Sequence, residues 1–201
     1  GNGGSTHYAM EDMALYSSLV NMTVIAASDP TQLKQVIQKS LVYPGPMSIR
    51  MDPGKKNRVI YPADAVFEIG KGYTAKEGKD ISIIACGEMV APAKKAAELL
   101  QAEGISVRVL DCFTIQPMDT KTVEKALRET RAVVTVEEHS TRGGLGEAVS
   151  HIAAELRGSA PMRLLGLPEE VVIGKSQELF AYYGLTPEGI SAAIKERLER
   201  E

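Results

Sequence analysis

Two periodicities of apolar residues alternate along this sequence. Short runs rich in Val and Ile predict buried strands, and apolar residues spaced three and four positions apart predict amphipathic helices. Over residues 1–51 the order is loop, helix, strand, helix, strand, with helices at about 8–18 and 30–41 and strands at 22–27 and 47–51. This order is typical of a parallel α/β unit that lacks its first half.

From Ile81 onward, strands and helices alternate completely. The predicted strands are 81–86, 107–110, 132–136 and 163–166, and the predicted helices are 90–102, 120–130 and 145–156, followed by two closing helices. Strands rich in Val, Ile and Leu between helices indicate a mostly parallel sheet covered on both faces. We therefore expect an α/β fold whose second part is a three-layer domain.

The region between these two parts has a different character. A polar cluster at 54–58 and a turn cluster at 77–80 flank a predicted hairpin around Val66 to Ile69. We expect this region to connect two units. It divides the chain into a first unit at 1–58, a linker with the hairpin at 59–80, and a second unit at 81–201.

The composition excludes several classes of protein. The 201 residues are 44% hydrophobic, which is ample for one large or two small packed domains. The formal net charge is −3 and no run of Lys or Arg forms a basic stripe, so we expect no nucleic-acid partner. No apolar stretch approaches the roughly 18 residues that span a bilayer, and no signal-peptide pattern is present. We therefore expect no membrane contact and a cytoplasmic location.

The cysteines and histidines do not form a recognisable metal-binding pattern. Cys86 ends one predicted strand and Cys112 follows another, which favours a reduced, buried pair over a disulfide. His7, His139 and His151 are scattered without the spacing of zinc ligands. We expect no metal site in this chain.

A glycine-rich loop at the start of the chain brings a histidine to the beginning of a predicted helix. Gly1, Gly3 and Gly4 precede His7. Glycines allow the backbone to approach a ligand closely, and a helix N-terminus offers N–H groups to an anion. Two interpretations remain open on this local pattern: an active-site loop, or an ordinary loop with a surface histidine.

A second polar segment follows the predicted strand at 132–136. It contains Glu137, Glu138 and His139 and then the glycine run 143–146. The carboxyl ends of parallel strands are common ligand sites, so one interpretation is a phosphate or nucleotide loop. The alternative is that the glycines permit close packing of strand and helix while the polar residues make contacts at a domain or subunit boundary.

Several motifs in order along the chain resemble the transketolase superfamily of thiamine-diphosphate enzymes. The first part is similar to the end of the pyrimidine-binding domain of transketolases and deoxyxylulose-phosphate synthases, and the second part to their C-terminal domain. The motifs are Gly3 to His7 with Glu11-Asp12, Asn21 to Ile25, Gly45 to Arg50, Phe113 to Asp119, Val134 to His139 with Gly143 to Gly146, and Tyr183 to Thr186. The nearest resemblance is to the separate C-terminal subunit of split transketolases.

The resemblance implies roles for two residues. His7 matches a histidine that faces the substrate and handles protons or hydroxyl groups during ketol transfer, which suits an imidazole with a pKa near neutrality. Arg50 matches an arginine that binds the substrate phosphate through its planar fork. The alternative for Arg50 is a structural ion pair with an acid such as Asp52. Gly3 and Tyr8 depart from the family's usual Asp and Gln, which leaves the identity of the sugar open.

The resemblance also implies what this chain does not contain. The glutamate and aromatic residues that hold the thiamine ring lie upstream of the histidine motif in the family, and the diphosphate and its Mg²⁺ are bound by another domain. We therefore expect thiamine diphosphate and Mg²⁺ only in the complete enzyme, an inactive isolated chain, and a fragment or ordered part of a longer subunit.

The expected partners are a second copy or an N-terminal transketolase subunit, together with a phosphorylated sugar. A truncated parallel sheet exposes an edge and an apolar face that must be covered, which supports association. Three alternatives to a transketolase subunit remain: a 2-oxo-acid dehydrogenase β-type subunit, a deoxyxylulose-phosphate synthase-type subunit, and a non-catalytic assembly module.

Overall fold

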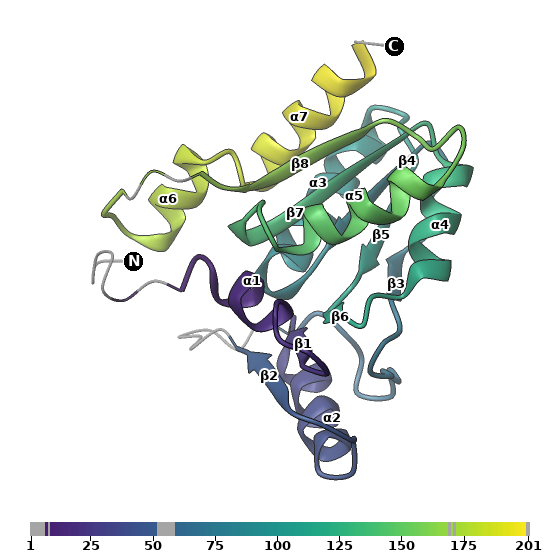
Figure 1. Cartoon of the computed structure of the whole chain (residues 1–201). Coiled ribbons are helices and arrows are strands. Elements are labelled where there is room, and N and C mark those ends of the chain that lie inside the picture. The colour runs from purple at the N-terminus through teal and green to yellow at the C-terminus, as the bar shows by residue number, and fades with distance from the viewer. Residues whose placement is uncertain (1–6, 8, 52–58, 169, 171, 200–201) are drawn as a thin grey trace.

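The structure is a computed structural model that describes residues 7, 9–51, 59–168, 170 and 172–199. These residues form two lobes, each built around its own sheet (Figure 1). The smaller sheet has three strands in the order β2-β1-β6, and the larger has five in the order β3-β5-β4-β7-β8. The strands are β1 (Thr23–Ala26), β2 (Met47–Arg50), β3 (Tyr73–Lys76), β4 (Ile81–Ala85), β5 (Val107–Asp111), β6 (Thr114–Gln116), β7 (Ala132–Ser140) and β8 (Met162–Leu167).

Helices connect these strands and cover both sheets. They are α1 (Asp12–Ser17), α2 (Pro30–Ser40), the short 3-10 helix η2 (Gly87–Met89), α3 (Val90–Ala102), α4 (Thr120–Glu129), α5 (Leu145–Glu155), α6 (Ser176–Tyr182) and α7 (Pro187–Glu199). The start of α2 shows why its sequence is helical: the Asp29 carboxylate accepts a hydrogen bond from Gln32 N at 2.8 Å, and Pro30 occupies the first turn. None of the helices in the described part of the chain has the length and apolar character needed to cross a membrane.

The larger lobe confirms the predicted three-layer arrangement. Strands β4, β5, β7 and β8 are parallel, and β3 is an antiparallel edge strand. Alternate residues of β4 face opposite layers: Ile83 belongs to the core that contains α3 and α7, whereas Ile84 belongs to the core that contains α4 and α5. The two faces of this sheet are therefore both buried, as the continuous apolar runs predict.

The smaller lobe contains a strand that the sequence pattern does not predict. β1 and β2 are parallel, with Thr23 opposite Met47 and Ala26 opposite Arg50, as expected for this unit. β6 adds to the other side of β1 in antiparallel orientation. Because β6 has only three residues and lies far along the chain, its apolar pattern is too short to identify it. The sheet of the first unit is therefore mixed rather than purely parallel.

The hairpin predicted around Val66 to Ile69 is wrong. These residues form no strand, and the nearest strand, β3, begins at Tyr73 and pairs with β5. Phe67 is buried, and its ring lies 4.9 Å from that of Tyr61 and 4.8 Å from that of Tyr73. Burial of these aromatic rings, rather than strand pairing, fixes the segment against the core.

Two further boundaries differ from the sequence prediction. The first helix begins at Asp12 rather than near residue 8, so His7 lies ahead of the helix and not at its first turn. β7 continues to Ser140, four residues beyond the predicted end at 136, so the polar segment is part of the strand.

Cys86 and Cys112 are free and buried, which confirms the reduced pair.

Candidate functional site

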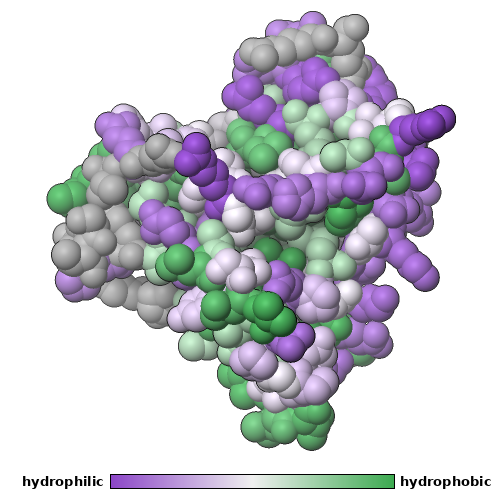
Figure 2. All heavy atoms as spheres, viewed as in Figure 1, coloured by the Kyte–Doolittle hydropathy of each residue, from purple (hydrophilic) through white to green (hydrophobic). Residues whose placement is uncertain are grey.

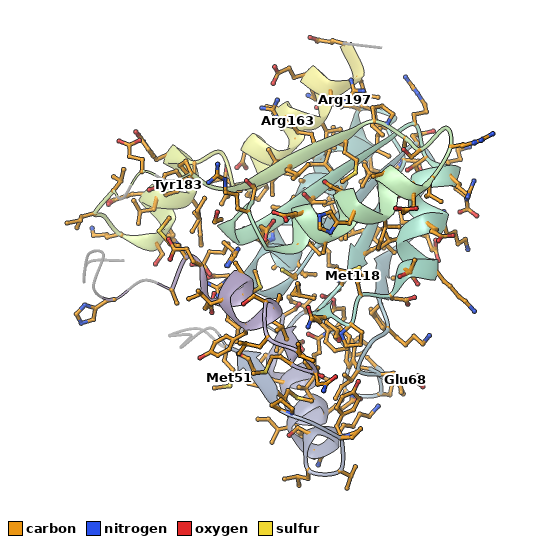
Figure 3. The ribbon with its side chains drawn as sticks, viewed as in Figure 1. Met51, Glu68, Met118, Arg163, Tyr183 and Arg197 are labelled. Atoms are coloured by element: carbon orange, nitrogen blue, oxygen red, sulfur yellow. The ribbon has the colours of Figure 1, made fainter. Side chains whose placement is uncertain are left out.

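A cavity of about 410 Å³ opens where the carboxyl ends of β1 and β2 face η2 and α6. Met51, just after β2, and Tyr183, just after α6, both line it, and Figure 3 shows them on opposite lobes. Leu179 and Phe180 of α6 give one wall an apolar character. The cavity is thus shared by two parts of the chain that are more than a hundred residues apart.

The structure brings the two predicted site residues to this one cavity. His7 is exposed and lines the cavity, and Arg50 lines it from the end of β2. Gly3 and Tyr8, where the sequence departs from the family motif, lie outside the described residues. The common cavity is the arrangement that a shared role in one ligand site requires.

The Arg50 guanidinium is held by residues from both lobes. Its Nε lies 3.2 Å from the Asp12 carboxylate, at the start of α1, and its Nη2 donates to the Ala9 carbonyl at 3.4 Å. Across the lobe boundary, Nη1 donates to the Glu138 carbonyl at 2.6 Å, and Nη2 lies 3.6 Å from the Glu138 carboxylate. The ion-pair interpretation is therefore realised through Asp12 and Glu138; Asp52 lies outside the described residues.

The glycines of segment 143–146 allow the N-terminus of α5 to bind the buried carboxylate of Glu137. The two Glu137 oxygens accept hydrogen bonds from Leu145 N and Gly146 N, both at 2.8 Å. A Cβ atom on Gly144 would lie 2.0 Å from Glu137 Oε2, so only glycine allows this approach. Burial raises the pKa of Glu137 to about 7, although the two backbone N–H groups favour its charged form.

This geometry decides between the two interpretations of the polar segment. The N–H groups that a phosphate would use at the start of α5 already bind Glu137. His139 is buried, and its Nε2 accepts a hydrogen bond from Ala14 N of α1 at 3.3 Å. Its Nδ1 is therefore the protonated nitrogen and donates to the Ser140 carbonyl at 2.6 Å. The segment makes close strand–helix packing and polar contacts between the lobes, and burial lowers the pKa of His139.

A second buried network joins the lobes at the end of β5. The Asp111 carboxylate accepts hydrogen bonds from Tyr61 OH at 2.6 Å and from Gln32 Nε2 at 2.9 Å. Burial raises the pKa of Asp111 to about 6, and burial together with the neighbouring carboxylate raises the pKa of Tyr61. This network lies outside the cavity lining and connects α2 to the larger sheet.

A sequence model of the family "Transketolase, C-terminal domain" matches residues 70–190. The chain belongs to this family. The match begins just before β3, covers all five strands of the larger sheet and ends in the first turn of α7. The resemblance that the motifs indicated is thereby confirmed for the transketolase C-terminal domain.

Curated relatives extend the similarity over almost the whole chain. The chain is 37% identical to one subunit of an apulose-4-phosphate transketolase of Phocaeicola vulgatus, covering 98% of this chain and 63% of that protein. It is 38% identical to a "Putative transketolase C-terminal section" of Methanocaldococcus jannaschii, covering 100% of this chain and 63% of that protein. A 1-deoxy-D-xylulose-5-phosphate synthase of Heliobacterium modesticaldum is 33% identical, covering 98% of this chain and 31% of that protein. The chain thus spans about 63% of the length of the first two relatives.

Solved structures support the same fold. A structure described as "Split gene transketolase, inactive beta4 tetramer" superposes with a TM-score of 0.88 at 38% identity, covering 98% of this chain and 64% of that chain. A transketolase of Pichia stipitis superposes with a TM-score of 0.77 at 22% identity, covering 99% and 28%. The second likeness shows the fold alone.

Sequence reasoning missed the residues that hold Arg50. Asp12 stands in the quoted motif after His7, and Glu138 stands in the polar segment after 132–136, but neither pattern joins them to an arginine. A local signal for these contacts does not exist, because Glu138 and Arg50 are 88 residues apart. Only the packing of β7 against the smaller lobe brings them together.

Proposed function

We propose that this chain is the C-terminal part of a transketolase subunit that, with thiamine diphosphate, transfers a two-carbon ketol unit between phosphorylated sugars. The observation that carries the proposal is the shared cavity: an imidazole and a guanidinium from separate segments face one space at the carboxyl ends of β1 and β2. The transketolase names of the curated relatives support the same reaction class. Sugar phosphates of the pentose phosphate type are the proposed substrates.

His7 and Arg50 would have different roles in the reaction. His7, with an imidazole that can accept or donate a proton near neutral pH, would handle a proton of a substrate hydroxyl. Arg50 would bind the phosphate of the sugar through its fork. An incoming phosphate would replace the longest contact of the guanidinium, which is the 3.6 Å ion pair with the Glu138 carboxylate.

The described residues do not fit a site for the cofactor's diphosphate and metal. They contain no group of three or more His, Cys, Asp or Glu residues that could hold a metal ion. The glycine-bounded start of α5, the best anion-binding candidate in the sequence, is occupied by the Glu137 carboxylate. We propose that thiamine diphosphate and Mg²⁺ belong to the complete enzyme, with their binding groups supplied by another domain or subunit.

The proposed partner is an N-terminal transketolase subunit, with pairing of identical copies as part of the assembly. The similar split transketolase is described as an inactive tetramer of β chains, which supports self-association and inactivity without the partner. Exposed apolar residues on this chain also favour association: Leu15 is 67% exposed and Leu41 is 82% exposed. Figure 2 shows apolar surface gathered at the lower end of the molecule, where α2 turns toward β2.

The test is reconstitution of the complete subunit with an N-terminal partner, thiamine diphosphate and Mg²⁺. Ketol transfer from a phosphorylated ketose should appear only in the mixture, and H7A should lower kcat by about 10² or more, the scale of general acid–base catalysis. Calorimetry with thiamine diphosphate and Mg²⁺ should show no specific binding to the complete subunit alone. An H7A enzyme with unchanged kcat would refute the role of His7.

A second candidate rests on the synthase from Heliobacterium modesticaldum, which matches 98% of this chain. In that case the reconstituted enzyme would form 1-deoxy-D-xylulose 5-phosphate, the product in that relative's name. Product analysis by mass spectrometry separates the two reactions, because the 1-deoxy sugar has one oxygen atom fewer than the corresponding ketol-transfer product. No product of either kind would favour a non-catalytic assembly module.

A further inference from the structure

The Asp12 carboxylate occupies a position that links the two predicted site residues. Asp12 is the first residue of α1, and His7 lies five positions before it in the sequence. Its Oδ2 lies 3.2 Å from Nε of Arg50, which belongs to β2. Both side chains are about four-fifths buried, with relative exposures of 23% and 22%. An ion pair this well shielded restrains the guanidinium more than a surface pair does.

The contacts of Arg50 differ according to which nitrogen they use. Asp12 is paired with Nε, on the inner edge of the fork. The two carbonyl contacts, from Ala9 and Glu138, use the outer Nη nitrogens. Because a guanidinium is planar, fixing Nε together with one Nη determines the direction in which the remaining Nη edge points. Asp12 is the carboxylate that fixes Nε.

The other oxygen of Asp12 is not engaged elsewhere. Within the described residues Oδ1 is buried and accepts no hydrogen bond. Its neighbour His139 lies 3.8 Å away at Nε2, but that nitrogen accepts a hydrogen bond from Ala14 N and so has no proton to donate to Asp12. The carboxylate therefore has Arg50 as its close cationic partner, and a buried carboxylate with few partners keeps that partner firmly in place.

We propose that Asp12 is a positioning residue for Arg50: it fixes the guanidinium so that its outer edge faces the cavity lined by His7 and receives the phosphate end of the sugar. This inference rests on the proposed function, since it names the side chain that prepares Arg50 for that substrate. It also places the preparation of the phosphate site on α1, the helix that follows His7 in the sequence. A shift of this helix would then move both site residues together.

The experiment compares two donors in the reconstituted complex: a phosphorylated ketose and the same ketose without its phosphate. D12A should raise KM for the phosphorylated donor about tenfold, the scale of one hydrogen-bonded charge, and leave KM for the unphosphorylated donor unchanged. Since Asn keeps the shape and an acceptor oxygen, D12N should give a smaller rise. E98Q, which removes an exposed ion pair with Lys95 on α3, is the matched control and should behave as the wild type.

A second measurement keeps this test separate from the reaction. Binding of inorganic phosphate to the complete subunit is followed by ³¹P NMR line broadening in the wild type, R50K, D12A and E98Q. Broadening should be lost in R50K, weakened about tenfold in D12A, and kept in E98Q. If phosphate binding follows this order but no ketol transfer occurs, the proposed function fails and the positioning role stands. Absence of phosphate binding in the wild type, unchanged binding in D12A, or an equal rise of KM for both donors overturns the positioning role.

Discussion

Gly143 offers a sharp test of how the two lobes are held together. Its φ is +68°, and a Cβ atom there would lie 2.4 Å from Cβ and 3.0 Å from Cα of Ala14 in α1. Gly158 has the same φ of +68°, but a Cβ atom there would meet nothing within 4 Å. The two glycines therefore share a backbone conformation and differ in the contact with the other lobe.

The expected magnitudes follow from this difference. An alanine at either position must adopt the left-handed conformation, which costs about 1–2 kcal/mol. G143A also forces α1 away from the larger lobe, and overpacking of this kind adds about 1–3 kcal/mol. We expect G143A to lower the free energy of unfolding by about 1–3 kcal/mol more than G158A does.

The assay is urea unfolding of the complete subunit followed by circular dichroism, with the slope of the transition compared among the wild type and both variants. Because α1 carries Asp12, G143A should also raise KM for a phosphorylated donor in the reconstituted complex, whereas G158A should not. If the two variants lose the same free energy within about 0.5 kcal/mol, the steric argument for the lobe contact is wrong.

Three further predictions concern the buried carboxylates. E137Q should lower the free energy of unfolding at pH 8 by about 1–3 kcal/mol, because an amide offers one acceptor oxygen to the N–H groups of Leu145 and Gly146; urea unfolding within about 0.5 kcal/mol of the wild type would contradict this. Burial raises the pKa of Asp111 to about 6, so its contribution to stability is full below the unfolded pKa of about 4 and is lost as pH rises through 6. The unfolding free energy of the wild type relative to D111N should therefore fall from pH 4 to 7, and a flat difference would refute the raised pKa. Y61F removes a donor to the Asp111 carboxylate and should cost about 1–3 kcal/mol at pH 8 and less at pH 5, where the acid is protonated; equal losses at both pH values would count against this pairing.

Much of the secondary structure could be predicted from the sequence, and the reason is local. The strands β4, β5 and β8 and the helices α3, α4 and α5 are defined by runs of apolar residues whose period is independent of the rest of the chain. The failures are short or aromatic elements. The apolar residues around Phe67 resemble a strand in the sequence, but Phe67 is buried by contacts between aromatic rings. β6 has only three residues and forms a strand because it pairs with the edge of β1.

Only part of the candidate site could be predicted from the sequence. His7 and Arg50 could be named because the family motifs that contain them are contiguous in sequence. The partners of Arg50 could not, since Glu138 comes from another lobe and Asp12 from another element. The same holds for Asp111, whose hydrogen-bond donors Tyr61 and Gln32 lie 50 and 79 residues away.

The sequence by itself determined the alternation of strands and helices and named His7 and Arg50 as candidate site residues, because each depends on neighbours along the chain. Tertiary structure decided which of those side chains meet. The carboxyl ends of β1 and β2 come to face η2 and α6 only when the two lobes pack, and that packing brings Glu138 to Arg50. Contacts of this kind depend on the distance between segments in space, which no pattern within one segment records.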